Sequence, residues 1–152
     1  GDLKSYKQVQ FRNVQTGEYI ISWNDPRGGG VLESSQKPDD KGFRFYQAAN
    51  AAPGNCEIKR IGWDAFNWSA YPKFIAVNHA KRIPNTTAPN APHAWNIEQV
   101  GSGVFIIKSG DACVTLVPGE KTHLNGPGSA VRLEKCQSGN KLQQWEIYVI
   151  SE

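Results

Sequence analysis

The segments WNIEQV at residues 95–100 and WEIYV at residues 145–149 both carry isoleucine two positions after a tryptophan. Apolar and polar residues alternate in the two segments, and a period of two is typical of a β-strand with one buried face. Phe45 opens a third such segment, so that Phe45, Trp95 and Trp145 recur every 50 residues. A fixed period of this length indicates an internal structural repeat. We therefore expect the three aromatic side chains to pack in one core.

Further strand-like segments recur with the same period, separated by glycine-containing turns. Opening strands are expected at residues 9–14, 56–61 and 104–109, and second strands at 18–21, 73–77 and 112–116. Third strands are expected at residues 31–32 and 130–133, whereas a proline-rich stretch at 84–92 obscures this position in the middle repeat. The pattern predicts an all-β fold, a β-trefoil of three four-stranded repeats in which six strands close a barrel and three hairpins cap it. A single domain is expected over residues 1–152, with repeats at about 6–50, 51–100 and 101–150.

The composition favours a turn-rich exported domain. The chain has 152 residues, of which 15 are glycine and 9 are proline, and a formal net charge of +3. Basic residues are scattered, and the pair Lys81-Arg82 is the nearest approach to a cluster, so direct nucleic-acid binding is not expected. The apolar run at residues 104–107 is far too short for a membrane span. We expect a secreted protein from which a signal peptide has been removed.

Three cysteines, Cys56, Cys113 and Cys136, are consistent with an oxidising compartment. Cys113 and Cys136 are 23 residues apart, and each lies beside strand-like sequence. A disulfide between them would staple a hairpin, which leaves Cys56 free or buried. No Cys-x-x-Cys pair or cluster of histidine and cysteine occurs, so a metal site is not expected.

The third repeat resembles the ricin B-type β-trefoil lectin repeat. The resemblance rests on Cys113-Val114-Thr115, on Cys136 and on Gln143-Gln144-Trp145, which match the Cys-x-Asp, second Cys and Gln-x-Trp of that repeat. In Gln-x-Trp, the tryptophan fills the core and the glutamine ties the hairpin. The resemblance therefore implies a carbohydrate-binding fold.

The residues that bind sugar in the ricin pattern are replaced here. Thr115 stands at the position of the aspartate that accepts sugar hydroxyls, Glu134 at that of the stacking aromatic ring, and Leu142 at that of an asparagine. Ile21 and Ala76 are expected at the aspartate position of the other two repeats. A ricin-like galactose site, which needs a carboxylate and a stacking ring, is therefore not expected.

Short segments also resemble the A and C subunits of bacterial cytolethal distending toxins. Residues 1–4 and 11–17 are similar to the start of the C subunit, and residues 102–109 and 113–115 to the last repeat of both subunits. Those subunits are ricin-like trefoils that bind the host cell and carry a DNase I-like toxic subunit. The resemblance implies a non-catalytic virulence protein with a nuclease-like subunit and a second trefoil subunit as partners.

The segment GWDAFNWSAYP at residues 62–72 is the first candidate binding site. It contains Trp63, Phe66, Trp68 and Tyr71, and it is expected to be a loop because the other repeats have tight turns at this place. An exposed aromatic patch of this kind would suit a glycan, a lipid surface or a protein partner. The alternative is a loop that folds back to plug one end of the barrel.

The segment WNDPR at residues 23–27 is the second candidate. Trp23 and Asp25, together with Arg27, could offer a ring, a carboxylate and a guanidinium to a polar ligand. The alternative is a plain exposed turn.

The sequence predicts neither an enzyme nor a cofactor, because His79, His93 and His123 are dispersed and no catalytic motif is present. The first hypothesis is a lectin-like module for a host-cell glycan or another surface ligand, either as a toxin subunit or as a stand-alone secreted lectin. The second is a β-trefoil protease inhibitor that presents a loop at residues 48–55 or 62–72. The third is a structural subunit that only holds a partner.

Overall fold

The computed structural model describes residues 8–25, 28–47, 55–62, 66–79 and 93–151, and within them the regular secondary structure is β-strand apart from one short 3-10 turn. The elements are β1 (Gln8–Asn13), β2 (Tyr19–Asn24), β3 (Gly30–Ser35), β4 (Phe43–Gln47), β5 (Asn55–Arg60), β6 (Phe66–Tyr71), β7 (Phe74–His79), β8 (Trp95–Gly101), β9 (Val104–Ser109), β10 (Ala112–Val117), β11 (Ala130–Lys135), the 3-10 turn η2 (Lys141–Gln143) and β12 (Trp145–Ser151). No helix in this described part of the chain is long and apolar enough to cross a membrane.

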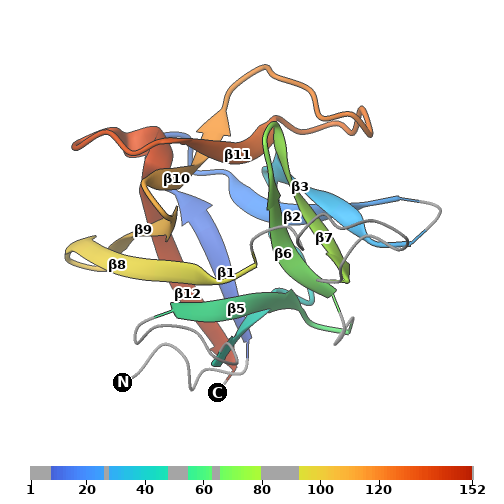
Figure 1. The fold of residues 1–152 in the computed structure, drawn as a ribbon, viewed down its shortest axis with the longest axis horizontal. Helices are drawn as coiled ribbons and strands as arrows, with labels where there is room; N and C mark the ends of the chain where they lie inside the picture. Colours follow the sequence, from blue (N-terminus) through green and yellow to red (C-terminus); the bar gives the residue numbers. More distant parts are fainter. Residues whose placement is uncertain (1–7, 26–27, 48–54, 63–65, 80–92, 152) are drawn as a thin grey trace, which may run out of the picture.

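Six strands form a closed barrel, and the other six form three hairpins. The antiparallel pairs β1–β12, β12–β9, β9–β8, β8–β5, β5–β4 and β4–β1 complete one circuit. The hairpins are β2–β3, β6–β7 and β10–β11, and β3 also pairs with β7 and β11 (Figure 1). This topology confirms the predicted β-trefoil.

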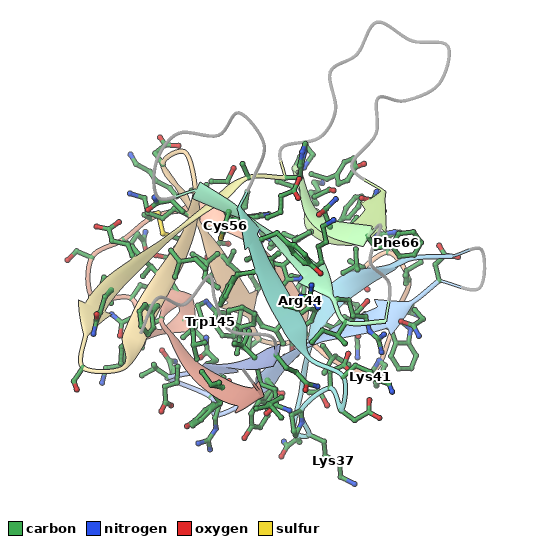
Figure 2. The ribbon with its side chains drawn as sticks, turned by 90° about the horizontal axis from the view of Figure 1, so that it is seen from below. Lys37, Lys41, Arg44, Cys56, Phe66 and Trp145 are labelled. Carbon is green, nitrogen blue, oxygen red and sulfur yellow. A yellow bond between two sulfur atoms is a disulfide. The ribbon has the colours of Figure 1, made fainter. Side chains whose placement is uncertain are left out.

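The recurring aromatic residues lie in the core, as predicted. Trp95 and Trp145 are fully buried, and Phe45 is 3% exposed. Each indole also makes a directed contact with a hairpin strand, since Trp95 Nε1 donates to the main-chain oxygen of Trp68 and Trp145 Nε1 to that of Val114, both at 3.0 Å. Figure 2 shows Trp145 among the side chains enclosed by the strands. These residues join the barrel to its cap.

The expected strands of the first and third repeats are confirmed, whereas those of the middle hairpin are shifted. Residues 73–77, expected as a second strand after a loop, belong instead to the third strand, β7. The second strand is β6 (Phe66–Tyr71), inside the segment expected to be a loop. Its residues at positions 68 and 70 belong to the core, and Asn67 and Ser69 beside them are buried as well, so this strand is covered on both faces.

Strand pairing aligns the three hairpins with one another. One residue of each opening strand pairs with one residue of the following strand, and the pairs are Arg12–Tyr19, Lys59–Asn67 and Lys108–Cys113. Ile20-Ile21, Trp68-Ser69 and Val114-Thr115 are therefore equivalent. Ser69, and not Ala76 as expected, occupies the aspartate position in the middle hairpin.

The predicted disulfide between Cys113 and Cys136 is confirmed, with an S–S distance of 2.00 Å. It connects β10 to the residue that follows β11, so that it closes the base of the third hairpin. Cys56 is buried on β5 within the core of the barrel.

A buried carboxylate joins the first hairpin to the third. Glu33 on β3 is fully buried and accepts hydrogen bonds from Thr122 Oγ1 at 2.5 Å and from the Gly128 amide at 3.1 Å. Beside it, the Ser34 amide donates to the Ser129 main-chain oxygen at 2.8 Å. A Cβ atom on Gly128 would lie 1.9 Å from the Ser34 oxygen, so only glycine permits this approach. The loop between β10 and β11 is thereby anchored on β3.

We predict that Trp145→Phe lowers the free energy of unfolding by about 1–3 kcal/mol more than Trp68→Phe does. Both indoles are fully buried, but only Trp145 Nε1 has a hydrogen-bond partner among the described residues, because that of Trp68 has none. The substitution removes the same atoms in both proteins and breaks a hydrogen bond only in the first. Urea denaturation measures the difference, and equal losses would contradict it.

Candidate functional site

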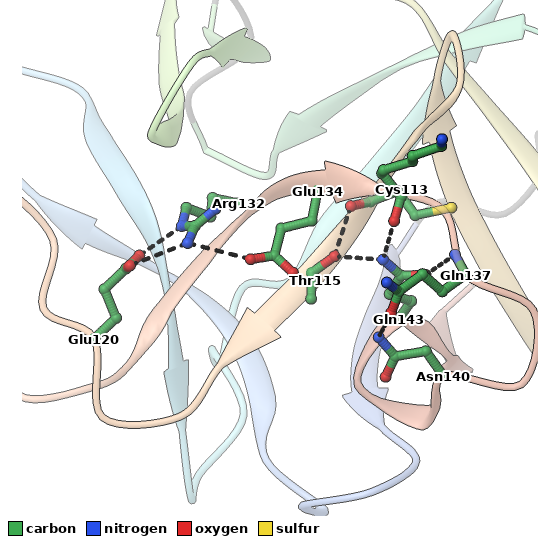
Figure 3. A network of polar contacts seen from close by, with 9 residues as sticks. Cys113, Thr115, Glu120, Arg132, Glu134, Gln137, Asn140 and Gln143 are labelled. Atoms are coloured by element: carbon green, nitrogen blue, oxygen red, sulfur yellow. Dashed lines mark hydrogen bonds and ion pairs between the residues drawn. The ribbon is translucent and has the colours of Figure 1, made fainter.

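The sugar position of the third repeat is filled by a network of internal hydrogen bonds (Figure 3). Thr115 Oγ1 donates to the Cys113 main-chain oxygen at 2.8 Å and accepts from Gln143 Nε2 at 3.1 Å. Gln143 Nε2 also donates to the Lys135 oxygen at 2.9 Å, and its Oε1 accepts from the Gln137 amide at 2.8 Å. The predicted role of the glutamine as a tie within the hairpin is confirmed, and the Thr115 hydroxyl is used inside the protein.

An ion-pair network occupies the place of the stacking ring. Arg132 contacts Glu134 at 3.2 Å and makes two bonds to Glu120, Nε–Oε2 at 2.6 Å and Nη2–Oε1 at 3.1 Å (Figure 3). Its hydrogen bonds hold the pKa of the Glu120 carboxyl below its usual value, and the same contact raises the pKa of Arg132. This surface is held together by charge pairs and offers no aromatic platform.

Trp68, predicted as a surface-binding residue, lies in the core instead. It is fully buried, with ring centroids at 5.1 Å from Phe11, 5.2 Å from Phe43 and 6.1 Å from Trp95. It cannot contact a surface ligand, because β6 turns this side chain toward the barrel. The prediction for Trp68 is therefore wrong.

Of the remaining aromatic residues of this segment, the two described ones, Phe66 and Tyr71, lie at opposite ends of β6 and have different neighbours. Phe66 is half-buried and packs against the core. Tyr71, at the end of β6, stacks on Phe74 with ring centroids 4.8 Å apart. Trp63 lies outside the described residues. Of this first candidate, Tyr71 is the aromatic side chain that lines a described pocket.

Trp23 lines an open pocket of about 450 Å³ on the first hairpin, which we call the Trp23 pocket. The indole is 38% exposed, since Ile20 and Ser22 face inward along β2 while Ile21 and Trp23 face outward. The lining residues come from the end of β2, the end of β3 and the loop before β4: Ile21, Ser22, Trp23, Asn24, Ser35, Lys37, Pro38, Asp39 and Asp40. Figure 2 shows Lys37 projecting from the rim of the molecule.

The two carboxylates of this pocket have different roles. Asp39 is 7% exposed, accepts from Arg60 Nε at 3.3 Å and caps the Lys41 amide at 3.0 Å, so that it fixes the loop. Asp40 is exposed, and no described residue bonds to its carboxylate. Ser22 lines the same pocket with a buried Oγ that lacks a hydrogen-bond partner among the described residues. The pocket thus combines an exposed ring with an accessible acceptor.

Asp25, expected beside Trp23, lines a different pocket. It meets Tyr71 in a hollow of about 280 Å³ between the tips of the three hairpins, which we call the junction pocket. The residues of the two candidate segments are therefore distributed over two pockets. Asp25 and Tyr71 line the junction pocket, and Trp23 lines its own pocket together with Asp40. Arg27 lies outside the described residues.

Sequence reasoning missed Asp40, Phe74 and His123 as pocket residues. Asp40 is 17 positions from Trp23, and the loop that carries it is held by the contact of Asp39 with Arg60 and by hydrogen bonds from Gln8 and Gln10 to the loop's main chain. No sequence motif predicts that Asp40 and Trp23 line the same pocket. The described residues also contain no group of three or more His, Cys, Asp or Glu side chains that could hold a metal ion.

Comparison with known proteins establishes the fold. No protein-family model and no curated protein sequence matches the chain. Among solved structures, Cry35Ab1 superposes with a TM-score of 0.69 at 17% identity, and the match covers 99% of this chain and 37% of that one. A mosquitocidal holotoxin gives 0.68 at 12% identity, covering 97% and 18%. SeviL, solved bound to the asialo-GM1 saccharide, gives 0.61 at 14% identity, covering 96% and 99%.

We predict that Glu120→Gln destabilises the protein by about 0.5 kcal/mol at pH 7 and by less in acid. The pKa of Glu120 is lowered in the folded state, mainly by the Arg132 hydrogen bond. A lowered carboxyl pKa stabilises the fold above the unfolded value of about 4.3, and this contribution is lost as the pH falls through the lower folded value. The effect is small because the side chain is 37% exposed.

Urea denaturation between neutral and acidic pH tests this prediction. Glu98→Gln is the matched control, because Glu98 pairs with Lys108 at 3.3 Å but is 51% exposed. If the loss of unfolding free energy in Glu120→Gln stays the same from neutral to acidic pH, the charge pair does not stabilise the fold.

Proposed function

We propose that this chain is a non-catalytic, lectin-like binding module that recognises cell-surface carbohydrate in the Trp23 pocket. The observation that carries the proposal is the exposed indole beside an exposed carboxylate, Asp40, within one open pocket. A pyranose presents an apolar face of C–H groups and a rim of hydroxyls. The indole can stack on the apolar face of the pyranose, and the carboxylate can accept hydrogen bonds from its hydroxyls. Similarity to SeviL supports the proposal at the level of the fold.

The other side chains of the pocket fit the same ligand. Asn24 is exposed at the end of β2 and can both donate to and accept from sugar hydroxyls. Asp39 and Arg60 hold the loop that carries Asp40, so that the carboxylate is positioned before a ligand arrives.

The test is a glycan array combined with binding to intact cells. Trp23→Ala is expected to weaken binding at least about tenfold, because it removes the stacking surface. Tyr148→Ala is the matched control, since Tyr148 is an aromatic residue that is 40% exposed on β12. Asp40→Asn is expected to weaken binding as well, and Asp111→Asn, at an exposed turn, is expected to leave it unchanged.

Full binding by Trp23→Ala, or equal losses in Trp23→Ala and Tyr148→Ala, would contradict the Trp23 pocket as the site. Absence of binding to any glycan or cell would contradict the function itself. Inhibition of a trypsin-like, papain-like or legumain-like protease at submicromolar concentration would instead favour the protease-inhibitor alternative.

At a finer level, we propose that the chain is the cell-binding and delivery subunit of a secreted toxin of the cytolethal distending type. The resemblance of residues 1–4, 11–17 and 102–109 to its trefoil subunits supports this assignment. The mosquitocidal holotoxin shows the same fold within a toxin. In such an assembly the enzymatic activity belongs to a separate, nuclease-like chain, and a second trefoil subunit completes the complex.

Purification from the native source, followed by mass spectrometry, tests the assembly. We expect a DNase I-like chain and a second trefoil chain to co-purify in fixed proportion. A chain that purifies alone and still binds glycan would overturn the toxin assignment and leave a stand-alone lectin.

A further inference from the structure

The junction pocket adjoins a second hollow, and the two share Phe74 and His123. The junction pocket, of about 280 Å³, is lined by all three hairpins, because Asp25 precedes β3, Tyr71 ends β6 and His123 lies in the loop after β10. The second hollow, of about 590 Å³, lies over the β6–β7 turn and β11, and we call it the lysine pocket. The shared residues place the two hollows side by side, and their combined volume suits a ligand of more than one sugar residue.

The wall between the two hollows is aromatic. The ring of Phe74 stacks on Tyr71 at 4.8 Å with 10° between the planes, and it contacts His123 at 4.4 Å. The Tyr71 hydroxyl accepts from Asn78 Nδ2 at 3.3 Å, so that its own O–H is available to a ligand. The Oδ1 of Asn78 is buried without a hydrogen-bond partner among the described residues, and such a group calls for a partner.

The positive charge of the lysine pocket resides in two lysines. Arg132 is committed to Glu120 and Glu134. Lys121 is held in place, because its Nζ donates to the main-chain oxygens of Gly126 at 3.2 Å and Pro127 at 3.1 Å. Lys73 is exposed at the β6–β7 turn, close enough that its charge helps to lower the pKa of the Glu120 carboxyl.

We infer that the joined junction and lysine pockets bind an acidic oligosaccharide, with a sugar ring against Phe74 and a carboxylate at Lys73 and Lys121. The charges orient the ligand. The two lysines line the lysine pocket and not the junction pocket, so a ligand carboxylate is attracted to the lysine pocket. This site is separate from the Trp23 pocket and does not depend on it.

The experiment uses the full chain and a panel of uronic-acid and sialic-acid oligosaccharides, each compared with its carboxyl-reduced counterpart. We expect at least one acidic member to bind and its reduced form to bind about threefold to tenfold more weakly. The double variant Lys73→Gln/Lys121→Gln is expected to show the same loss for the acidic member and none for the reduced one. Higher ionic strength is expected to weaken only the acidic member.

Matched controls separate this site from the Trp23 pocket. Lys135→Gln/Lys141→Gln removes two exposed lysines outside both hollows and is expected to leave binding unchanged. Trp23→Ala is expected to lose the neutral glycans of the array and to keep the acidic oligosaccharides with their reduced forms, whereas the lysine double variant is expected to weaken only the acidic oligosaccharides. Phe74→Ala, with folding checked by circular dichroism, is expected to weaken both members of an acidic and reduced pair.

Three results would overturn the inference: no acidic member binds, the acidic and reduced members bind equally, or the two double-lysine variants lose binding equally. The binding of neutral glycans that have no acidic parent in the panel is assigned to the Trp23 pocket, so it tests the proposed function independently of these three results.

Discussion

Two buried hydrogen bonds, each from an indole N–H to a main-chain oxygen, hold the cap of this trefoil on its barrel. Trp95 on β8 reaches β6, and Trp145 on β12 reaches β10. A buried bond of this kind is costly to leave unmade, so it fixes the position of each hairpin more sharply than apolar contact does. Phe45 has no N–H to offer in the first repeat. There the hairpin is held from the side, by Glu33 and the loop that carries Thr122 and Gly128.

Because buried contacts hold each hairpin in place, the side chains on the outer faces of the hairpins can differ between repeats. In the third repeat Thr115 bonds to Gln143, and Arg132 pairs with Glu120 and Glu134, so that these polar atoms satisfy one another. In the first repeat the equivalent position is Ile21, which has no side-chain hydrogen bond to form, and the adjacent indole remains exposed. The same framework therefore carries a position filled by internal hydrogen bonds on one hairpin and an exposed aromatic ring in a pocket on another.

The features that repeat along the sequence are the ones that it predicts correctly. Trp95 and Trp145 can be placed in the core because they recur with a strand-like pattern. Trp68 is equally buried, but the equivalent residues in the other repeats are Ile20 and Val114. No repeated aromatic residue therefore indicates that it lies in the core, and the irregular sequence around it resembles a loop. The disulfide is also predictable, because two cysteines flank one hairpin. Asp40 is not, since its approach to Trp23 depends on the Asp39–Arg60 contact between segments far apart in sequence.

The Trp23 pocket and the junction pocket lie where the three hairpins differ in the length of their turns. The strand register makes Trp23, Tyr71 and Val117 equivalent, and each is the next-to-last or last residue of its strand. Tyr71 pairs with Phe74 across the short turn at residues 72–73, which forces the two rings to stack. The strand that carries Trp23 is separated from β3 by the longer segment 25–29, and Val117 precedes the long loop at 118–129. That loop brings His123 to both the junction pocket and the lysine pocket, and Lys121 to the lysine pocket. Trp23 and Tyr71 therefore occupy the same position in two repeats but line different pockets, because the length of the following turn determines which residues surround each ring.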